Sequence, residues 1–198
     1  MVADERQALH QLLARRWSSR AFAPDPLPDG AIETLIDAAR WAPSYGNRQP
    51  WRFVVVQQPE RLASLHAALR RGNAYAKVAP VSIALCGDPE DGQIVDGKHY
   101  YLLDSGLALE NLLLQAVAMG LHAHPMGGFD EAMVRDVLGI PEQVRVLALI
   151  AVGWPGRLDD LDERTREREL RERTRLPRAE VCAYDGWTFP NDSTHETG

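Results

Sequence analysis

The sequence has few of the features that mark membrane or secreted proteins. No apolar run approaches the roughly 20 residues that a helix needs to cross a bilayer. The N-terminus lacks the basic and then apolar layout of a secretory signal. The only two cysteines, Cys86 and Cys182, show no CxxC spacing, and Cys86 stands in an apolar run that suits a small core residue. We therefore expect a protein of the reducing cytoplasm that binds no membrane.

A net positive charge is also absent. The 198 residues carry a net charge of −6, whereas general nucleic-acid binding requires a basic surface, so we expect no nucleic-acid partner. Neither a GxGxxG fingerprint nor a P-loop occurs. Hydrophobic residues make up 45% and charged residues 25%, as in ordinary globular proteins. Without an internal repeat or a tandem boundary, the length predicts a single domain over residues 1–198.

Helical and strand-like patterns alternate along the chain. The expected helices are 4–17, 59–70, 99–119 and 130–138, together with a helix that begins after its capping residue Asp29. The expected strands are 52–57, 80–86 and 144–152. This order predicts an α+β or α/β class with one central sheet. The helix 99–119 is apolar nearly all round, which predicts burial in the domain centre or in a subunit interface.

A polar turn between the second helix and the first expected strand carries Ser44, Asn47 and Gln49. Each side chain can donate and accept hydrogen bonds, so the turn can hold the edge of a flat heteroaromatic ligand such as a flavin or a pterin. The same segment also fits a helix stop and a loop bounded by Pro43 and Pro50. Taken alone, the turn favours this plainer interpretation.

Two basic clusters stand near opposite ends of this acidic chain. Arg16, Ser18 and Arg20 alternate beyond the first helix, so their donors can point to one side of an extended segment. Arg173 and Arg175 alternate in the same way. Guanidinium groups pair bidentately with phosphate, although cations at a helix end also complement its dipole. Together the clusters indicate one defined anionic ligand.

The turn 125–129 follows the long helix and contains paired glycines, which let the backbone approach a ligand. A single Gly-Gly pair does not identify a site by itself. His122 and His124 stand close to it at i,i+2. Because no third ligand with suitable spacing is visible, we expect a structural role for both and no metal site.

Residues 159–175 are rich in Asp, Glu and Arg and have few apolar side chains. Such a stretch is typical either of a solvated helix with i,i+4 ion pairs or of an arm that folds only against a partner.

Taken in order, these segments resemble the flavin-dependent nitroreductase family from Arg16 to Trp187. The matching segments are 16–22 (Arg-x-Ser-x-Arg-x-Phe), 42–51 (Pro-Ser-x-x-Asn-x-Gln-Pro-Trp), the glycine turn 125–129, 153–155 (Gly-Tyr-Pro in the family) and the basic pair before Leu-Pro in 173–177. The resemblance implies an α+β fold, with a mixed central sheet wrapped by helices, built as an intertwined homodimer. It also implies that residues 157–198 form a C-terminal arm on the partner subunit.

The resemblance further implies an FMN oxidoreductase that takes hydride from the co-substrate NAD(P)H. Such an enzyme reduces a small-molecule acceptor, for example a nitroaromatic or a quinone, by a ping-pong mechanism. The flavin carries the chemistry, so no catalytic side chain is expected. The implied cofactor-binding residues are Arg16, Trp17, Ser18, Arg20, Pro43, Ser44, Asn47, Gln49, Pro125, Met126, Gly127, Gly128, Arg173 and Arg175.

Three departures from the family pattern bear on substrate choice. Trp17 replaces a polar residue, so only its backbone or its ring face could contact the cofactor. Gly127 stands where some members carry Glu, and the short segment 88–98 predicts a reduced lid. Two other functions stay open: a non-redox flavin-binding or storage protein, and a relative that uses reduced FMN for oxygen-dependent or dehalogenating chemistry.

Overall fold

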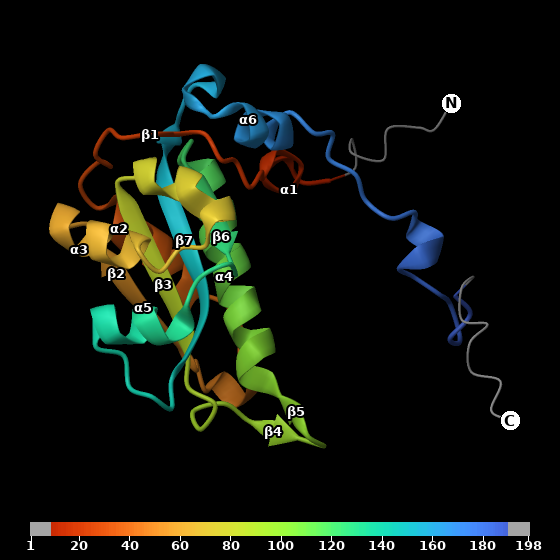
Figure 1. Cartoon of the computed structure of the whole chain (residues 1–198). Coiled ribbons are helices and arrows are strands. Elements are labelled where there is room, and N and C mark those ends of the chain that lie inside the picture. The colour runs from red at the N-terminus through yellow and green to blue at the C-terminus, as the bar shows by residue number, and fades with distance from the viewer. Residues whose placement is uncertain (1–8, 190–198) are drawn as a thin grey trace, which may run out of the picture.

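A computed structural model describes residues 9–189 and arranges them as a central sheet with helices on both faces (Figure 1). The strands are β1 (Phe22–Ala23), β2 (Trp51–Val56), β3 (Val81–Gly87), β4 (Ile94–Val95), β5 (Lys98–His99), β6 (His122–Met126) and β7 (Arg145–Pro155). The α-helices are α1 (Gln11–Arg15), α2 (Ala31–Arg40), α3 (Pro59–His66), α4 (Tyr100–Ala118), α5 (Glu131–Leu138) and α6 (Glu163–Glu169). Short 3₁₀ helices are η2 (Tyr45–Asn47), η3 (Arg71–Val78), η4 (Leu158–Asp160) and η5 (Arg178–Glu180).

The sheet is built around β7, the longest strand. β3 and β6 pair with the same stretch of β7 and therefore lie on opposite sides of it. β1 pairs with the end of β7 at Trp154 and Pro155, and β2 pairs with β3. The α+β class is confirmed, but the expectation of a mixed sheet is wrong for residues 9–189, where every pairing is antiparallel. β3 and β6 do run in the same direction; they are kept apart because the oppositely directed β7 lies between them.

The two faces of the sheet carry separate parts of the core. Val81, Ile83 and Leu85 of β3 pack with α2 and α4, whereas Ala84 and Cys86 pack with α3 and α5 on the opposite face. This alternation is the period of two that a strand imposes. β3 is buried along its whole length, so it reads as a continuous apolar run rather than an alternating one. The expectation that Cys86 is a core residue is confirmed.

The long helix α4 agrees with the expected helix 99–119 to within one residue at each end. Ala108, Leu112 and Ala116 are fully buried against the sheet. Leu102 and Leu103 lie on its other side and are 51% and 57% exposed. The helix therefore leaves an apolar surface uncovered within one chain. In residues 9–189, no helix combines the length and the hydrophobicity that a membrane span requires.

Several local expectations need correction. Of the expected helix 4–17, the structure forms only α1, and residues 1–8 lie outside the described part of the chain. Asp29 does not cap α2; Gly30 holds the N-cap position with φ 78°, a left-handed conformation that glycine adopts at no steric cost. Residues 124–126 belong to β6 rather than to a turn, because they pair with β7. The loop 87–98 contains the hairpin β4–β5, which turns at Asp96 and Gly97.

Candidate functional site

Residues 16–21 leave α1 as an extended strip, and β6 holds its backbone. His124 Nδ1 donates to the carbonyl of Ser19 at 2.9 Å, and His122 Nδ1 donates to the carbonyl of Ala21 at 3.1 Å. Two residues apart on one strand, the two imidazoles point to the same face of β6. Both rings therefore anchor the strip. Among residues 9–189, no three His, Cys, Asp or Glu side chains form a group that could hold a metal ion.

The hydrogen bonds of His124 define its tautomer. A carbonyl only accepts, so Nδ1 carries the proton, and Nε2 accepts from the hydroxyl of Tyr75 at 2.9 Å. Burial lowers the pKa of His124 to about 4, despite the hydrogen bond to Ser19. Burial also raises the pKa of Tyr75 to about 12. This pair is therefore neutral over the whole physiological pH range.

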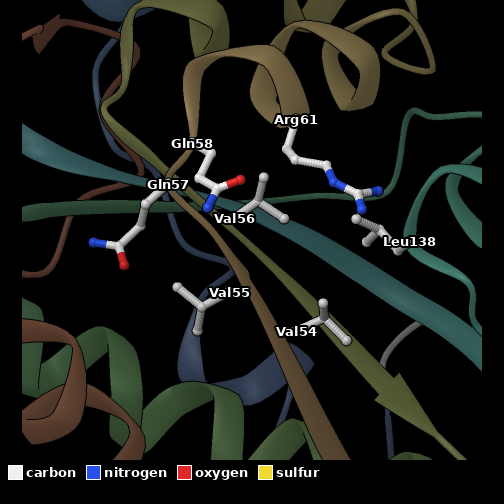
Figure 2. A pocket seen from close by; sticks show the side chains of 7 residues that line it. All are labelled: Val54, Val55, Val56, Gln57, Gln58, Arg61 and Leu138. Carbon is white, nitrogen blue, oxygen red and sulfur yellow. The ribbon is translucent and has the colours of Figure 1, made fainter.

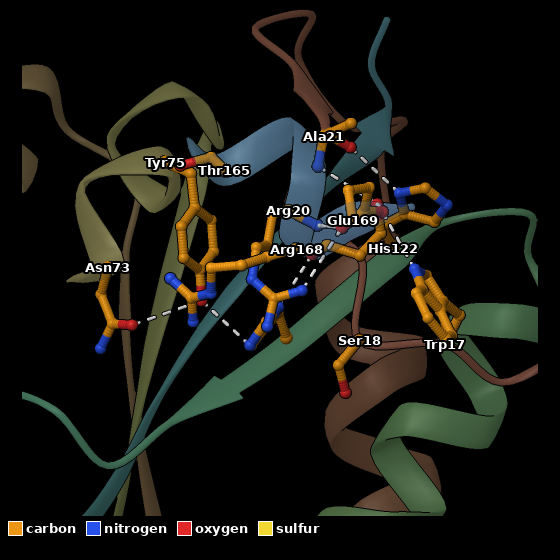
Figure 3. Close-up of polar contacts among 12 residues, drawn as sticks. Trp17, Ser18, Arg20, Ala21, Asn73, Tyr75, His122, Thr165, Arg168 and Glu169 are labelled. Atoms are coloured by element: carbon orange, nitrogen blue, oxygen red, sulfur yellow. Dashed lines mark hydrogen bonds and ion pairs between the residues drawn. The ribbon is translucent and has the colours of Figure 1, made fainter. Parts of the chain in front are cut away.

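The strip is also held from α6 by the carboxylate of Glu169 (Figure 3). Its Oε1 accepts from the indole N–H of Trp17 at 2.9 Å and from the hydroxyl of Ser19 at 2.6 Å. Its Oε2 accepts from the backbone N–H of Arg20 at 2.8 Å, and the Arg20 guanidinium lies 3.6 Å away. Burial alone would raise the pKa of Glu169, but the bonds from Ser19, Trp17 and Arg20 outweigh burial and lower it. The carboxylate stays charged.

Outside this strip an open cavity of about 510 Å³ brings basic residues together from both ends of the chain. Its lining residues are Leu9, Leu13, Ala14, Arg16, Glu110, Arg173 and Arg175. Arg173 donates to the carbonyl of Ala14 at 2.9 Å, and its guanidinium carbon lies 5.3 Å from the centre of the Trp17 ring. Arg175 donates to its neighbouring carbonyl at 2.7 Å and is otherwise exposed. The cavity presents three arginines to one anion, and the carboxylate of Glu110 lies 3.9 Å from Arg16 Nε.

Two members of the first basic cluster differ in where their side chains lie. Arg16 donates to the hydroxyl of Ser18 at 3.2 Å, so these two side chains stay together. Arg20 does not line the cavity; its guanidinium lies 5.8 Å from the ring centre of Tyr75 and close to Glu169. The Nε atom of Arg20 is buried and has no hydrogen-bond partner within residues 9–189. A buried donor of this kind is rare without a reason.

The polar turn is ordered by its own side chains. Ser44 Oγ accepts from the backbone N–H of Gln49 at 3.0 Å, and the Gln49 amide donates to the Asn47 side chain at 3.0 Å. Asn47 and Gln49 adopt φ of 54° and 50°, a conformation that costs a non-glycine residue about 1 to 3 kcal/mol. The exposed Pro43 precedes them. The turn therefore exposes two amides in a strained but fixed arrangement.

The glycine turn places its residues in different environments. Pro125 and Met126 lie at the end of β6, and the Met126 side chain is buried in the core, so it offers a ligand only its backbone. Gly127 is exposed, and a side chain there would meet open space. At Gly128 a Cβ atom would lie 2.8 Å from the amide nitrogen of Asn73, which donates to the Gly128 carbonyl at 3.0 Å. A side chain at position 128 would therefore displace the Asn73 amide from this bond.

One chain does not gather all the expected residues at a single place. Neither the polar turn nor the glycine turn lines the arginine cavity. The backbone N–H of Tyr45 donates to Asp104 near the N-terminal end of α4, whereas α1 and α6 lie toward the other end of that helix (Figure 1). A second cavity, of about 350 Å³, follows the edge strand β2 and holds none of the expected site residues (Figure 2).

The sequence interpretation missed Glu169, Tyr75 and Asn73. Glu169 stands in the stretch that was expected to be a solvated helix or an arm, and nothing in its immediate neighbours distinguishes it. Thr165 and Glu169 stand four residues apart, which places them on one side of α6 and is the signal that was available. Thr165 is indeed buried.

Comparison with known proteins identifies the family. The family model described as "Nitroreductase family" matches residues 13–88 and 71–154, two overlapping segments that together span more than half of the chain. The chain belongs to the nitroreductase family.

The family's fold recurs in solved structures. A structure described as an oxidoreductase containing FMN is 33% identical, superimposes with a TM-score of 0.82, and the match covers 91% of this chain and 93% of that one. A nitroreductase family protein from Streptococcus pneumoniae is 26% identical with a TM-score of 0.72, over 87% and 97% of the two chains. A protein from Thermus thermophilus named NADH dehydrogenase is 34% identical over 71% of this chain and 83% of its own length. The α+β nitroreductase fold that the resemblance implied is confirmed.

Proposed function

We propose that this nitroreductase-family protein binds FMN and passes electrons from NAD(P)H to a small-molecule acceptor such as a nitroaromatic or a quinone. The observation that carries the proposal is the cavity in which Arg16, Arg173 and Arg175 meet. Their guanidinium groups suit the phosphate of a mononucleotide. The name of the solved relative that contains FMN supports the same cofactor.

The remaining residues fit the other parts of such a ligand. The unpartnered Nε of Arg20 is a donor for the pyrimidine edge or the ribityl chain, and a cation there stabilises negative charge on the ring. The open space at Gly127 would let the backbone approach the ring face, and its N–H or that of Gly128 would supply a hydrogen-bond donor to the ring. When bound, FMN supplies the hydride and electron transfer. The protein then needs no nucleophile or acid–base pair of its own.

We propose that the polar turn completes the site of a second copy of the chain. Asn47 and Gln49 expose their amides away from the arginine cavity of their own chain, so they are available to the flavin of a partner. The exposed Leu102, Leu103 and Leu107 of α4 supply an apolar surface for such a homodimer.

The C-terminal segment suits an arm that lies over the partner. After α6, residues 170–189 run away from the sheet and end apart from it (Figure 1), and Leu176, Tyr184 and Trp187 are 64%, 77% and 78% exposed. Within the described residues β2 has a free edge, along which the cavity of Figure 2 runs. Edge strands and exposed apolar segments of this kind cover one another in assemblies. We place residues 157–198 in that arm, of which 190–198 lie outside the described part.

We further propose a ping-pong order and a cytoplasmic location. One exposed ring face, near Gly127, would serve NAD(P)H first and the acceptor second, so the two substrates exclude each other. NADH and NADPH are both candidates, because no separate dinucleotide fingerprint distinguishes them.

The test uses purified full-length protein. Its absorbance spectrum should show bound flavin, anaerobic NADH or NADPH should bleach the yellow colour, and p-benzoquinone or a nitroaromatic should restore it. Colourless protein that takes up no FMN contradicts the cofactor. Bound FMN that neither nucleotide bleaches identifies a flavin-binding or storage protein. Colour that only oxygen or a halogenated acceptor restores identifies the other alternative chemistry.

A further inference from the structure

One carboxylate joins the two ends of the chain. Glu169 is the last residue of α6, and its side chain is 7% exposed. All of its hydrogen-bond donors lie in the strip 17–20, about 150 residues earlier in the sequence. A buried carboxylate is costly unless it is compensated, and here side-chain and backbone donors both compensate it.

The contacts of Glu169 continue to the arginine cavity through Trp17. The indole N–H points to Glu169, while the face of the same ring lies 5.3 Å from the Arg173 guanidinium. This is a cation–π distance. Arg173 lines the cavity and also holds the carbonyl of Ala14. Glu169 does not line the cavity itself. Its influence on an anion bound there is therefore indirect.

We propose that Glu169 is a positioning residue for the phosphate end of the FMN site: it fixes the Trp17 ring under Arg173 and fixes the backbone strip that carries Arg16 and Arg20. This inference rests on the proposed function.

Whether FMN binds more weakly or more tightly to a Glu169 variant distinguishes a positioning role from simple electrostatic repulsion. A negative charge near a cationic cavity weakens anion binding through Coulomb repulsion. On charge alone, Glu169→Gln should bind phosphate groups more tightly. If Glu169 positions the cations, the same substitution should weaken binding, because an amide cannot accept all of these donors and presents its own N–H groups to them.

The experiment titrates flavin-free full-length protein with FMN and with riboflavin, which lacks the phosphate, and follows flavin fluorescence. For Glu169→Gln we expect FMN affinity to fall about tenfold and riboflavin affinity to fall by only about threefold or less, because the two flavins share the Arg20 contact but not the phosphate contacts. Glu167→Gln is the matched control, because it removes the same charge from an exposed position of α6. It should change neither affinity. Unchanged or tighter FMN binding by Glu169→Gln, or equal losses for both flavins, overturns the inference.

Trp17→Phe provides a second variant if Glu169→Gln does not fold. Phenylalanine keeps a ring for Arg173 but has no N–H for Glu169, so we expect a several-fold loss of FMN affinity with riboflavin little changed. Wild-type FMN affinity in this variant overturns the role of Trp17. If the wild-type protein binds neither flavin, the proposed function itself is wrong. If the wild-type protein binds FMN and both variants bind it with the same affinity, the positioning role is refuted and the proposed function is not.

Discussion

At the scale of single residues, the polar groups around the strip 16–21 differ in what they can do. His124 bonds through both ring nitrogens and Glu169 through both carboxylate oxygens to the protein itself. Arg175 bonds only its neighbouring carbonyl within residues 9–189 and lines the cavity, so its remaining donors are free for a ligand. Side chains with saturated bonds hold the site, and side chains with spare donors are the ones to test for binding.

Arg175→Ala should weaken FMN binding. The loss of one exposed guanidinium contact to phosphate is worth about 1 kcal/mol, or roughly fivefold in the dissociation constant. Flavin fluorescence titration measures it. Arg171→Ala, which removes an exposed arginine that does not line the cavity, should bind FMN like the wild type. Equal losses in both variants would show a diffuse charge effect instead of a phosphate contact.

His124 predicts how stability depends on pH. Its pKa of about 4 in the folded protein lies below the ordinary 6.5, so between these values the unfolded chain binds a proton that the folded chain does not. The free energy of unfolding is therefore complete above pH 6.5 and falls as the pH drops toward 4, by up to about 3 kcal/mol from this group.

Urea unfolding at several pH values tests this prediction. His124→Gln removes the titrating group and should flatten the slope between pH 6.5 and 4 relative to the wild type. His99→Gln removes an exposed imidazole and serves as the control. If the His124→Gln slope equals that of the wild type, another group is responsible for the loss in acid.

At the scale of elements, α4 divides its apolar side chains between two tasks. Leu112 is fully buried against the sheet, whereas Leu103 on the other side is 57% exposed. A helix with an apolar stripe on one side needs one packing surface, and a helix that is apolar on two sides needs two. The domain supplies the first surface, and the proposed homodimer supplies the second.

A matched pair of truncations separates these tasks. Leu112→Ala should lower the free energy of unfolding by about 2 to 5 kcal/mol, because it leaves a cavity in the core. Leu103→Ala removes the same atoms and should change it by less than about 0.5 kcal/mol in dilute protein. It should instead raise the dimer dissociation constant in light-scattering dilution series. Equal destabilisation by both truncations would contradict the division.

Elements also show how far sequence reasoning reaches. β3, β7 and α4 were predictable because burial makes each a long apolar run. β6 was not, because its strand character comes from pairing with a segment more than 20 residues away. The β4–β5 hairpin carried a readable signal, since Asp96 and Gly97 both adopt positive φ and Asp-Gly is a favoured two-residue turn.

The candidate site was predictable in the same uneven way. That Arg16, Arg173 and Arg175 meet at one cavity followed from their alternation and from the resemblance. The partners of Glu169 did not, because no local pattern encodes a contact between α6 and a strip about 150 residues away. Contacts of that range depend on the complete fold.

At the scale of the whole molecule, the C-terminal segment is the least integrated part. Val181, Tyr184 and Trp187 expose most of their surface, and the segment leaves the body of the protein (Figure 1). Large apolar side chains in water favour association, so this segment and the α4 surface support the same proposed dimer.

Deleting residues 179–198 should weaken the dimer about tenfold or more, because it removes these contacts while retaining Arg173 and Arg175. Light scattering over a dilution series gives the dissociation constant, and circular dichroism checks that the helices persist. Serine at Val181, Tyr184 and Trp187 in the full-length chain should have a similar effect. A dimer as tight as the wild type in both proteins would place the arm on its own subunit.

The left-handed backbone at Asn47 and Gln49 has a kinetic consequence. The folded chain already holds this segment in its strained conformation before any ligand binds. Hydrogen bonds to the side chains of Ser44 and Asn47 maintain that conformation. Both carboxamides are therefore preformed for a ligand. The association rate constant should be set by diffusional encounter and not by a conformational change of the chain.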